Sequence, residues 1–176
     1  MANELDNLPK VVRDLVEKQN IYENLMRYVR GQDRKDLAMM QSAYWPDGTD
    51  DHAAFVGNGR EFCQWAYDGQ KVSGHSALHH CSNVLIELDG ENQAKCESVF
   101  LYVMIFADKN VTKVTGGRYR DLCEKRDGEW KILRRVCIFD YAHELEGAKD
   151  FFGIFNMPAT TVFGDLYPND PIYQEW

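Results

Sequence analysis

The sequence predicts an α+β fold: a cone-shaped α+β barrel in which a curved, mostly antiparallel sheet wraps around a long N-terminal helix and encloses a pocket. Helical periodicity fills the N-terminal part of the chain and long extended segments follow it, without the βαβ alternation of a parallel sheet. The extended segments are longer than the usual strand of about five or six residues. Long strands curl, so a helix laid against them closes a hollow cone.

The first helix is expected over residues 8–31, with Pro9 in its first turn and Gly31 as its stop signal. Apolar side chains recur at steps of three and four, or at sums of such steps, which predicts one buried face. The members of this face are Val11, Leu15, Tyr22, Met26 and Val29. Asp33, four residues after Val29, would extend the same face.

The later elements follow from turn signals and from strand patterns. A short helix is expected over residues 34–43, and the Tyr-Trp-Pro-Asp-Gly segment 44–48 is expected to end it as a turn. A strand near 50–56 and a helix over 60–67 come next. The long strands are expected at 76–88, 94–107, 113–125 and 130–143.

The chain is expected to hold one domain, residues 1–145, followed by an aromatic-rich C-terminal extension, residues 146–176. The extension is too aromatic for a disordered tail, so we expect it to pack on the domain or on a neighbouring subunit. Its aromatic residues are Phe151, Phe152, Phe155, Phe163, Tyr167, Tyr173 and Trp176.

Composition excludes several classes of function. The net charge of -8 and the absence of a basic cluster argue against a nucleic-acid partner. Five cysteines without CxxC spacing favour neither a disulfide framework nor a cysteine zinc site. No signal core or long apolar run is present, so we expect no membrane partner and a cytoplasmic location.

Asp50-Asp51-His52 invites a metal interpretation, but the spacing matches no helical metal motif and adjacent strand residues point to opposite faces. Phosphate loops and serine nucleophile elbows are also absent from the sequence. We therefore expect no metal and no cofactor.

Four segments carry a resemblance to a known family: Gly31-Gln32-Asp33, the segment 44–48, Leu78-His79-His80-Cys81-Ser82-Asn83 and Gly116-Gly117-Arg118-Tyr119. Over residues 8–145 the chain resembles SnoaL-like proteins of the nuclear-transport-factor-2-like superfamily. Within it, the chain is most similar to the branch holding scytalone dehydratase and hexachlorocyclohexane dehydrochlorinase, whose helix-end aspartate and strand histidine form a catalytic dyad.

The resemblance implies that Asp33 and His79 form this dyad, that Arg135 is a pocket arginine and that Tyr119 lines the pocket. The chain departs from the two enzymes at other positions. Tyr28 stands where the dehydrochlorinase has a basic residue, and Gln32 stands where scytalone dehydratase has a tyrosine. The strand 94–107 also lacks the second histidine of scytalone dehydratase. We therefore expect a substrate shared with neither enzyme.

An Asp–His dyad suits proton removal, because the carboxylate fixes the imidazole tautomer and stabilises the imidazolium that forms. Asp33 has an alternative role as the N-cap of the helix after it. Strict alternation places His80, rather than His79, on the face of Val84. A β-bulge between the histidines and Val84 would reconcile this pattern with His79 as the base.

Arg135 lies on an otherwise apolar strand face, so it is expected either to pair with Asp33 or to hold an anionic or leaving group. Aromatic side chains supply the candidate substrate contacts, each with an alternative role in the core. These candidates are Tyr28, Tyr44, Trp45, Tyr119 and Phe139.

These observations predict a cofactor-independent lyase that performs a dehydratase-type elimination on a hydrophobic, aromatic or polycyclic small molecule. His79 is the expected base, Asp33 its partner, and Arg135 holds the substrate or leaving group. The alternatives are an isomerase or polyketide cyclase of the same fold and a non-catalytic small-molecule-binding or oligomerisation domain. A homo-oligomer, dimer or trimer, is expected by analogy with the family.

Overall fold

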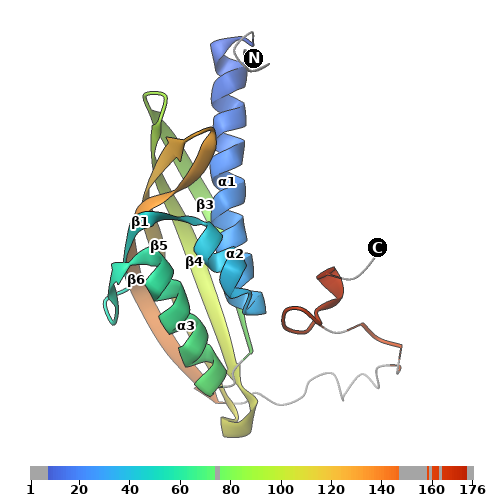
Figure 1. Cartoon of the computed structure of the whole chain (residues 1–176). Helices are drawn as coiled ribbons and strands as arrows, with labels where there is room; N and C mark the ends of the chain where they lie inside the picture. The colour runs from blue at the N-terminus through green and yellow to red at the C-terminus, as the bar shows by residue number, and fades with distance from the viewer. Residues whose placement is uncertain (1–7, 74–75, 147–157, 159, 163, 174–176) are drawn as a thin grey trace.

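A computed structural model describes residues 8–73, 76–146, 158, 160–162 and 164–173 (Figure 1). The helices are α1 (Lys10–Arg34), α2 (Leu37–Ser42) and α3 (Gly59–Ser73), with short 3-10 helices η2 (Ala107–Lys109) and η4 (Pro171–Tyr173). The strands are β1 (Tyr44–Asp51), β2 (Val56–Asn58), β3 (Ser76–Asp89), β4 (Gln93–Phe106), β5 (Val111–Arg126) and β6 (Glu129–Glu146). The predicted α+β class is confirmed.

The six strands form one sheet in the order β2-β1-β6-β5-β4-β3. Every neighbouring pair is antiparallel except β1 and β6, which run parallel. In Figure 1, α1 lies along this sheet and α3 crosses in front of β5 and β6. None of the helices in the described part of the chain is long and apolar enough to cross a membrane.

The buried face of α1 differs from the predicted one. Val11 and Leu15 are 66% and 63% exposed, so they do not belong to the buried face. The side that meets the sheet carries Ile21, Leu25 and Tyr28, each at most 1% exposed. It also carries polar side chains, which a search for apolar periodicity leaves out.

The end of α1 also differs from the prediction. Gly31 does not stop the helix, which continues to Arg34 and ends where Lys35 adopts a left-handed conformation with φ 55°. A Cβ at Gly31 would lie 2.7 Å from the backbone nitrogen of Met40, so glycine is needed for close packing of α2. Asp36 caps α2 by accepting from Met39 N at 3.0 Å. The capping role considered for Asp33 is therefore wrong.

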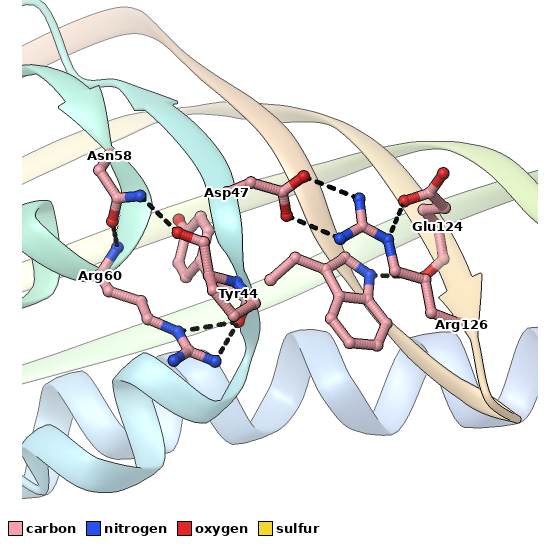
Figure 2. Close-up of polar contacts among 8 residues, drawn as sticks. Tyr44, Asp47, Asn58, Arg60, Glu124 and Arg126 are labelled. Atoms are coloured by element: carbon pink, nitrogen blue, oxygen red, sulfur yellow. Dashed lines mark hydrogen bonds and ion pairs between the residues drawn. The ribbon is translucent and has the colours of Figure 1, made fainter.

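The segment expected as a turn at 44–48 belongs to strand β1. Pro46 is tolerated because the pairing of β1 with β6 is irregular between Tyr44 and Thr49. Figure 2 shows how this strand is fixed: Arg60 donates to Tyr44 O at 3.2 and 3.1 Å, and Arg126 binds Asp47 through two bonds of 2.7 and 3.0 Å. These contacts tie β1 to Arg60 of α3 and to Arg126 of β5. His52 follows directly after the end of β1.

The predicted bulge in β3 is confirmed. Asn83 has φ 46°, and the pairing register of β3 with β4 shifts between Ser82 and Leu85. Because the bulge switches the face of the strand, His79 before it and Ile86 after it can lie on the same side. His79 is less exposed than its neighbour His80, and Ile86 is buried in the core.

The described part of the C-terminal extension contacts the end of α1. Tyr167 N donates to Arg34 O at 2.8 Å, and Asp170 forms an ion pair with Arg34 at 3.3 Å. The guanidinium carbon of Arg30 lies 5.1 Å from the centroid of the Tyr173 ring. The other aromatic residues singled out in the extension, Phe151, Phe152, Phe155, Phe163 and Trp176, lie outside the described residues.

Candidate active site

A cavity of about 380 Å³ opens between α1, α3 and the sheet. Its wall is mainly apolar and aromatic, with two histidines and two glutamines as its polar side chains besides Thr115 and tyrosine hydroxyls. The aromatic members are Tyr28, Phe62, Trp65, Phe100, Tyr102, Tyr119 and Phe139. Such a wall suits a hydrophobic small molecule that is oriented by a few polar groups.

The structure brings Asp33 and His79 together. His79 Nδ1 lies 2.6 Å from Asp33 Oδ1, and the backbone N–H of His79 donates to both carboxylate oxygens at 2.9 and 3.0 Å. A carboxylate accepts hydrogen bonds, so Nδ1 carries the proton and Nε2 retains a lone pair. The bulged strand β3 and the last turn of α1 thus create one oriented imidazole.

Asp33 lies behind this imidazole and does not line the cavity. Its carboxylate is 9% exposed and borders a separate cavity on the other side, together with Arg34, Lys35 and His80. The His79 ring stacks on Tyr102 with centroids 4.1 Å apart. The ring is therefore held by the carboxylate at one nitrogen and by an aromatic face.

Tyr28 and two glutamines form a polar network at the cavity wall. Gln32 Nε2 donates to Tyr28 OH at 2.9 Å, and Gln70 Nε2 donates to Gln32 Oε1 at 3.0 Å. Burial raises the pKa of Tyr28 well above its usual value, although the charge of Arg135 opposes this shift. The phenol therefore stays protonated and can donate a hydrogen bond to a substrate oxygen.

Arg135 lies outside the cavity wall, in contrast to the pocket position that the resemblance implies. Its guanidinium binds the carboxylate of Asp121, not that of Asp33, through two bonds of 2.7 Å and is 1% exposed. It lies 4.3 Å from the Tyr28 ring centroid and 4.1 Å from that of Tyr119. Arg135 thus places a neutralised cation beneath the cavity, where it supports the two tyrosine rings.

The other predicted contacts divide into two groups. Tyr28, Tyr119 and Phe139 line the cavity. Tyr44 is fully buried and donates to Asp50 at 2.5 Å, whereas the indole of Trp45 donates to Glu124 O at 2.9 Å on the outside of β1. These last two side chains are therefore not cavity contacts.

A second Asp–His pair was missed by the sequence-based site prediction. His52 Nδ1 contacts Asp50 Oδ1, and the His52 ring lines the cavity and stacks on Phe62 with centroids 4.1 Å apart. The signal is present in the sequence, because residues 50 and 52 are two apart and alternate residues of an extended chain share a face.

Among the described residues, no group of three or more histidine, cysteine or acidic side chains is arranged to hold a metal ion. Cys137 lines the cavity, but burial raises the pKa of its thiol to about 12. A protonated thiol is a poor nucleophile. The two cavity histidines with carboxylate partners are the side chains that suit proton transfer.

Comparison with solved structures shows the same fold in several proteins. A scytalone dehydratase-like protein of Novosphingobium aromaticivorans is 24% identical, with a TM-score of 0.68, over 74% of this chain and 88% of that one. The hexachlorocyclohexane dehydrochlorinase LinA-type3 of Novosphingobium barchaimii is 18% identical, with a TM-score of 0.68, over 75% and 92%. A Mycobacterium tuberculosis protein of unknown function is 23% identical, with a TM-score of 0.67, over 76% and 78%.

No curated protein sequence matches the chain. A family model does: residues 13–136 match the SnoaL-like domain, which covers most of α1, the strands β1 to β5, the first part of β6 and the two Asp–His pairs. The chain belongs to the family of SnoaL-like domains.

Proposed function

We propose that the protein is a cofactor-independent lyase that removes a proton and a leaving group from a hydrophobic small molecule. One observation carries this proposal: His79 lines an aromatic cavity while its Nδ1 is bound to Asp33 at 2.6 Å. A histidine whose tautomer is fixed by a carboxylate at Nδ1 can act as a general base through Nε2.

In the proposed reaction, Nε2 of His79 takes a proton from the carbon next to a carbonyl group. The electron pair of the broken C–H bond forms the C=C bond, and the leaving group departs with the electron pair of its own bond to carbon. The protonated phenol of Tyr28 is placed to donate a hydrogen bond to the carbonyl oxygen as negative charge develops there. Asp33 stabilises the imidazolium.

The cavity favours an aromatic substrate. Its volume of about 380 Å³ lies at the lower end of the range for small-molecule sites, and its wall contains seven aromatic rings. A flat ring can stack on these faces, and the glutamine network can orient one polar group. The named relatives, a scytalone dehydratase-like protein and a dehydrochlorinase, are elimination enzymes by name, which supports this class of reaction.

The geometry favours elimination through His79 over the isomerase alternative, in which an aspartate acts as the base. Asp33 lies behind the imidazole and away from the cavity wall, so it meets the substrate only through His79. A non-catalytic binding site would need no carboxylate to fix the tautomer of a cavity histidine.

The test uses proton exchange as a direct readout of the base. The purified protein is incubated in D₂O with 4-phenylbutan-2-one, an aromatic ketone without a leaving group, and exchange at C3 is followed by NMR. Elimination of 4-hydroxy-4-phenylbutan-2-one to the conjugated enone is followed by ultraviolet absorbance. We expect His79→Gln to lower both rates by about 10²–10⁴-fold, the usual contribution of a general base.

His80→Gln is the matched control, because His80 is an exposed neighbour on the same strand. It should leave both rates unchanged. Equal rates in the wild type and in His79→Gln, or exchange that depends on Asp33 but not on His79, would rule out the proposed role of His79.

A further inference from the structure

In the second pair, Asp50 and His52, the histidine lines the same cavity as His79, and the pair has no role in the proton abstraction described above. His52 reaches the cavity from the end of β1, and its side chain is 13% exposed. Its ring contacts Phe62 from α3 and lies 5.9 Å from the ring of Tyr119 on β5. Three elements therefore fix an imidazole that faces the substrate.

The surroundings of Asp50 differ from those of Asp33. The side chain of Asp50 has no exposed surface, and its carboxylate contacts the hydroxyl of Tyr44 and the ring of His52. Arg135 stands opposite Asp50 in the ladder between β1 and β6, but its guanidinium is bound to Asp121. His52 contacts the Asp50 carboxylate directly through Nδ1, and a carboxylate at this nitrogen stabilises an imidazolium. The contact therefore suits a histidine that donates a proton from Nε2.

The two histidines enter the cavity from different parts of the sheet. His79 lies on β3, and His52 follows β1; the strands β4, β5 and β6 lie between them in the sheet order. The curvature of the sheet brings both rings to one cavity. A substrate that fills this cavity can therefore meet a base from β3 and an acid from the β1 edge.

We infer that His52 is a general acid that protonates the leaving group, with Asp50 as its positioning residue, and that this leaving group is a hydroxyl. The inference rests on the proposed elimination. Hydroxide is a poor leaving group and needs a proton, whereas a halide leaves without one. The protein thus acts as a dehydratase on a β-hydroxy carbonyl compound.

The step balances without an oxidant or reductant. His79 Nε2 takes the proton from Cα, and the C–H electron pair becomes the C=C bond. The Cβ–O bond breaks, and its oxygen takes the Nε2 proton of His52 and leaves as water. The turnover leaves His79 protonated and His52 neutral, and exchange of protons with solvent restores both.

The experiment compares two leaving groups on one carbon skeleton. The probes are 4-hydroxy-4-phenylbutan-2-one and its acetate ester, which releases an acetate anion without protonation. We expect His52→Gln to slow elimination of the alcohol by about 10²–10⁴-fold, and to slow elimination of the ester and C3 exchange of 4-phenylbutan-2-one far less, so that the ratio of the alcohol rate to the ester rate falls. His143→Gln, at an exposed position on β6, is the control.

Equal loss on both probes would overturn the inference, because it would show that His52 only maintains the structure. Equal rates in His52→Gln and the wild type on the alcohol would overturn it as well. If the wild-type protein supports neither exchange nor elimination, the proposed function fails by a separate criterion.

The protonation state gives a readout that does not depend on turnover. Nitrogen-15 NMR of labelled histidine at neutral pH should show protons on both ring nitrogens of His52, and Asp50→Asn should remove one of them. A neutral His52 ring in the wild-type protein would overturn the inference.

Discussion

The two Asp–His pairs share one geometry and differ in what else their carboxylates contact. In both pairs a carboxylate oxygen contacts Nδ1 of an imidazole that lines the same cavity. The Asp33 carboxylate also accepts the backbone N–H of His79 and borders a second cavity near the surface. The Asp50 carboxylate has no exposed surface and accepts a further hydrogen bond from the hydroxyl of Tyr44.

In the reaction that we propose, this difference lets one local motif supply opposite halves of an acid–base step. The backbone N–H of His79 helps to stabilise the Asp33 anion, and His79 is the proposed base. Asp50 is enclosed and contacts the ring of His52, the proposed acid. Pairs of titratable groups in contrasting environments are a recurring way to divide the roles of acid and base in one site.

The largest effect on the rate of elimination is expected from Asp33→Asn, which tests the Asp33–His79 pair. An amide can present N–H to Nδ1 of His79 and so favour the wrong tautomer, and the comparable change in a serine-protease triad lowers kcat by about 10⁴-fold. We expect a loss of about 10³–10⁴-fold in kcat for elimination of both the alcohol and the ester. The rate of enone formation measures it.

Asp50→Asn should affect the two substrates unequally, with a loss on the alcohol and little change on the ester. The contrast between Asp33→Asn and Asp50→Asn would then separate the base from the acid. Equal behaviour of these two variants on both substrates would show that the pairs do not divide the reaction.

The fold class could be predicted from local patterns, because a helical N-terminal part is followed by long apolar strands. The Asp33–His79 pair was predicted from the resemblance, since strict alternation along the strand favoured His80. The buried face of α1 could not be predicted from apolar periodicity. Asn24 and Gln32 are 1% and 5% exposed there, since the first donates to Ala43 O at 3.0 Å and the second to Tyr28 OH. A polar side chain with a partner inside is indistinguishable in sequence from a solvated one.

The partner of Arg135 could not be predicted from the pattern of its own strand. Asp121 stands opposite Arg135 in the ladder between β5 and β6 and neutralises it there, which alternation within β6 does not reveal. The pairing of His52 with Asp50 depends on the 50/52 spacing, whereas the metal interpretation of this segment compared adjacent residues. Assembly as a dimer or trimer and a cytoplasmic location stay predictions.

A smaller effect is expected from Tyr44→Phe, which removes one donor from Asp50 and keeps the buried ring. Loss of a hydrogen-bond partner for a buried acceptor costs about 1–3 kcal/mol, more when the acceptor is charged. Urea denaturation should show this decrease in the free energy of unfolding. Exchange of 4-phenylbutan-2-one should be unaffected, because Tyr44 has no contact with the Asp33–His79 pair; a loss of exchange would contradict the separation of the pairs.

Asn83→Val tests the bulge, on which only the His79 pair depends. Asn83 has φ 46°, a left-handed conformation that costs a β-branched residue about 1–2 kcal/mol. We expect a loss of stability of that size and slower C3 exchange, since the strand can relieve the strain by shifting register and turning His79 outward. Asn83→Gly is the matched control and should retain exchange; nitrogen-15 spectra of His52 should be the same in all three proteins.

The smallest effect concerns the thiols near Asp50. Burial, with a smaller contribution from the charge of Asp50, raises the pKa of Cys63 to about 12, from an ordinary value of 9.0. The folded state therefore holds this proton where the unfolded state has lost it, so this group lowers the free energy of unfolding as pH rises from 9 to about 12, by at most about 1.4 kcal/mol per pH unit.

Asp50→Asn removes the negative charge but not the burial, so the pKa of Cys63 should fall below about 12 and remain above 9.0. The alkaline loss of stability due to this thiol should then be smaller than in the wild type. Asp33→Asn should leave this titration unchanged, because Asp33 is not among the charges that shift Cys63. The carbon-13 shift of the Cys63 β-carbon, followed from pH 8 to the onset of unfolding, measures it. A shift of the same size in both variants would mean that the charge of Asp50 is not confined to its own side of the cavity, and the division between the two pairs would lose its electrostatic basis.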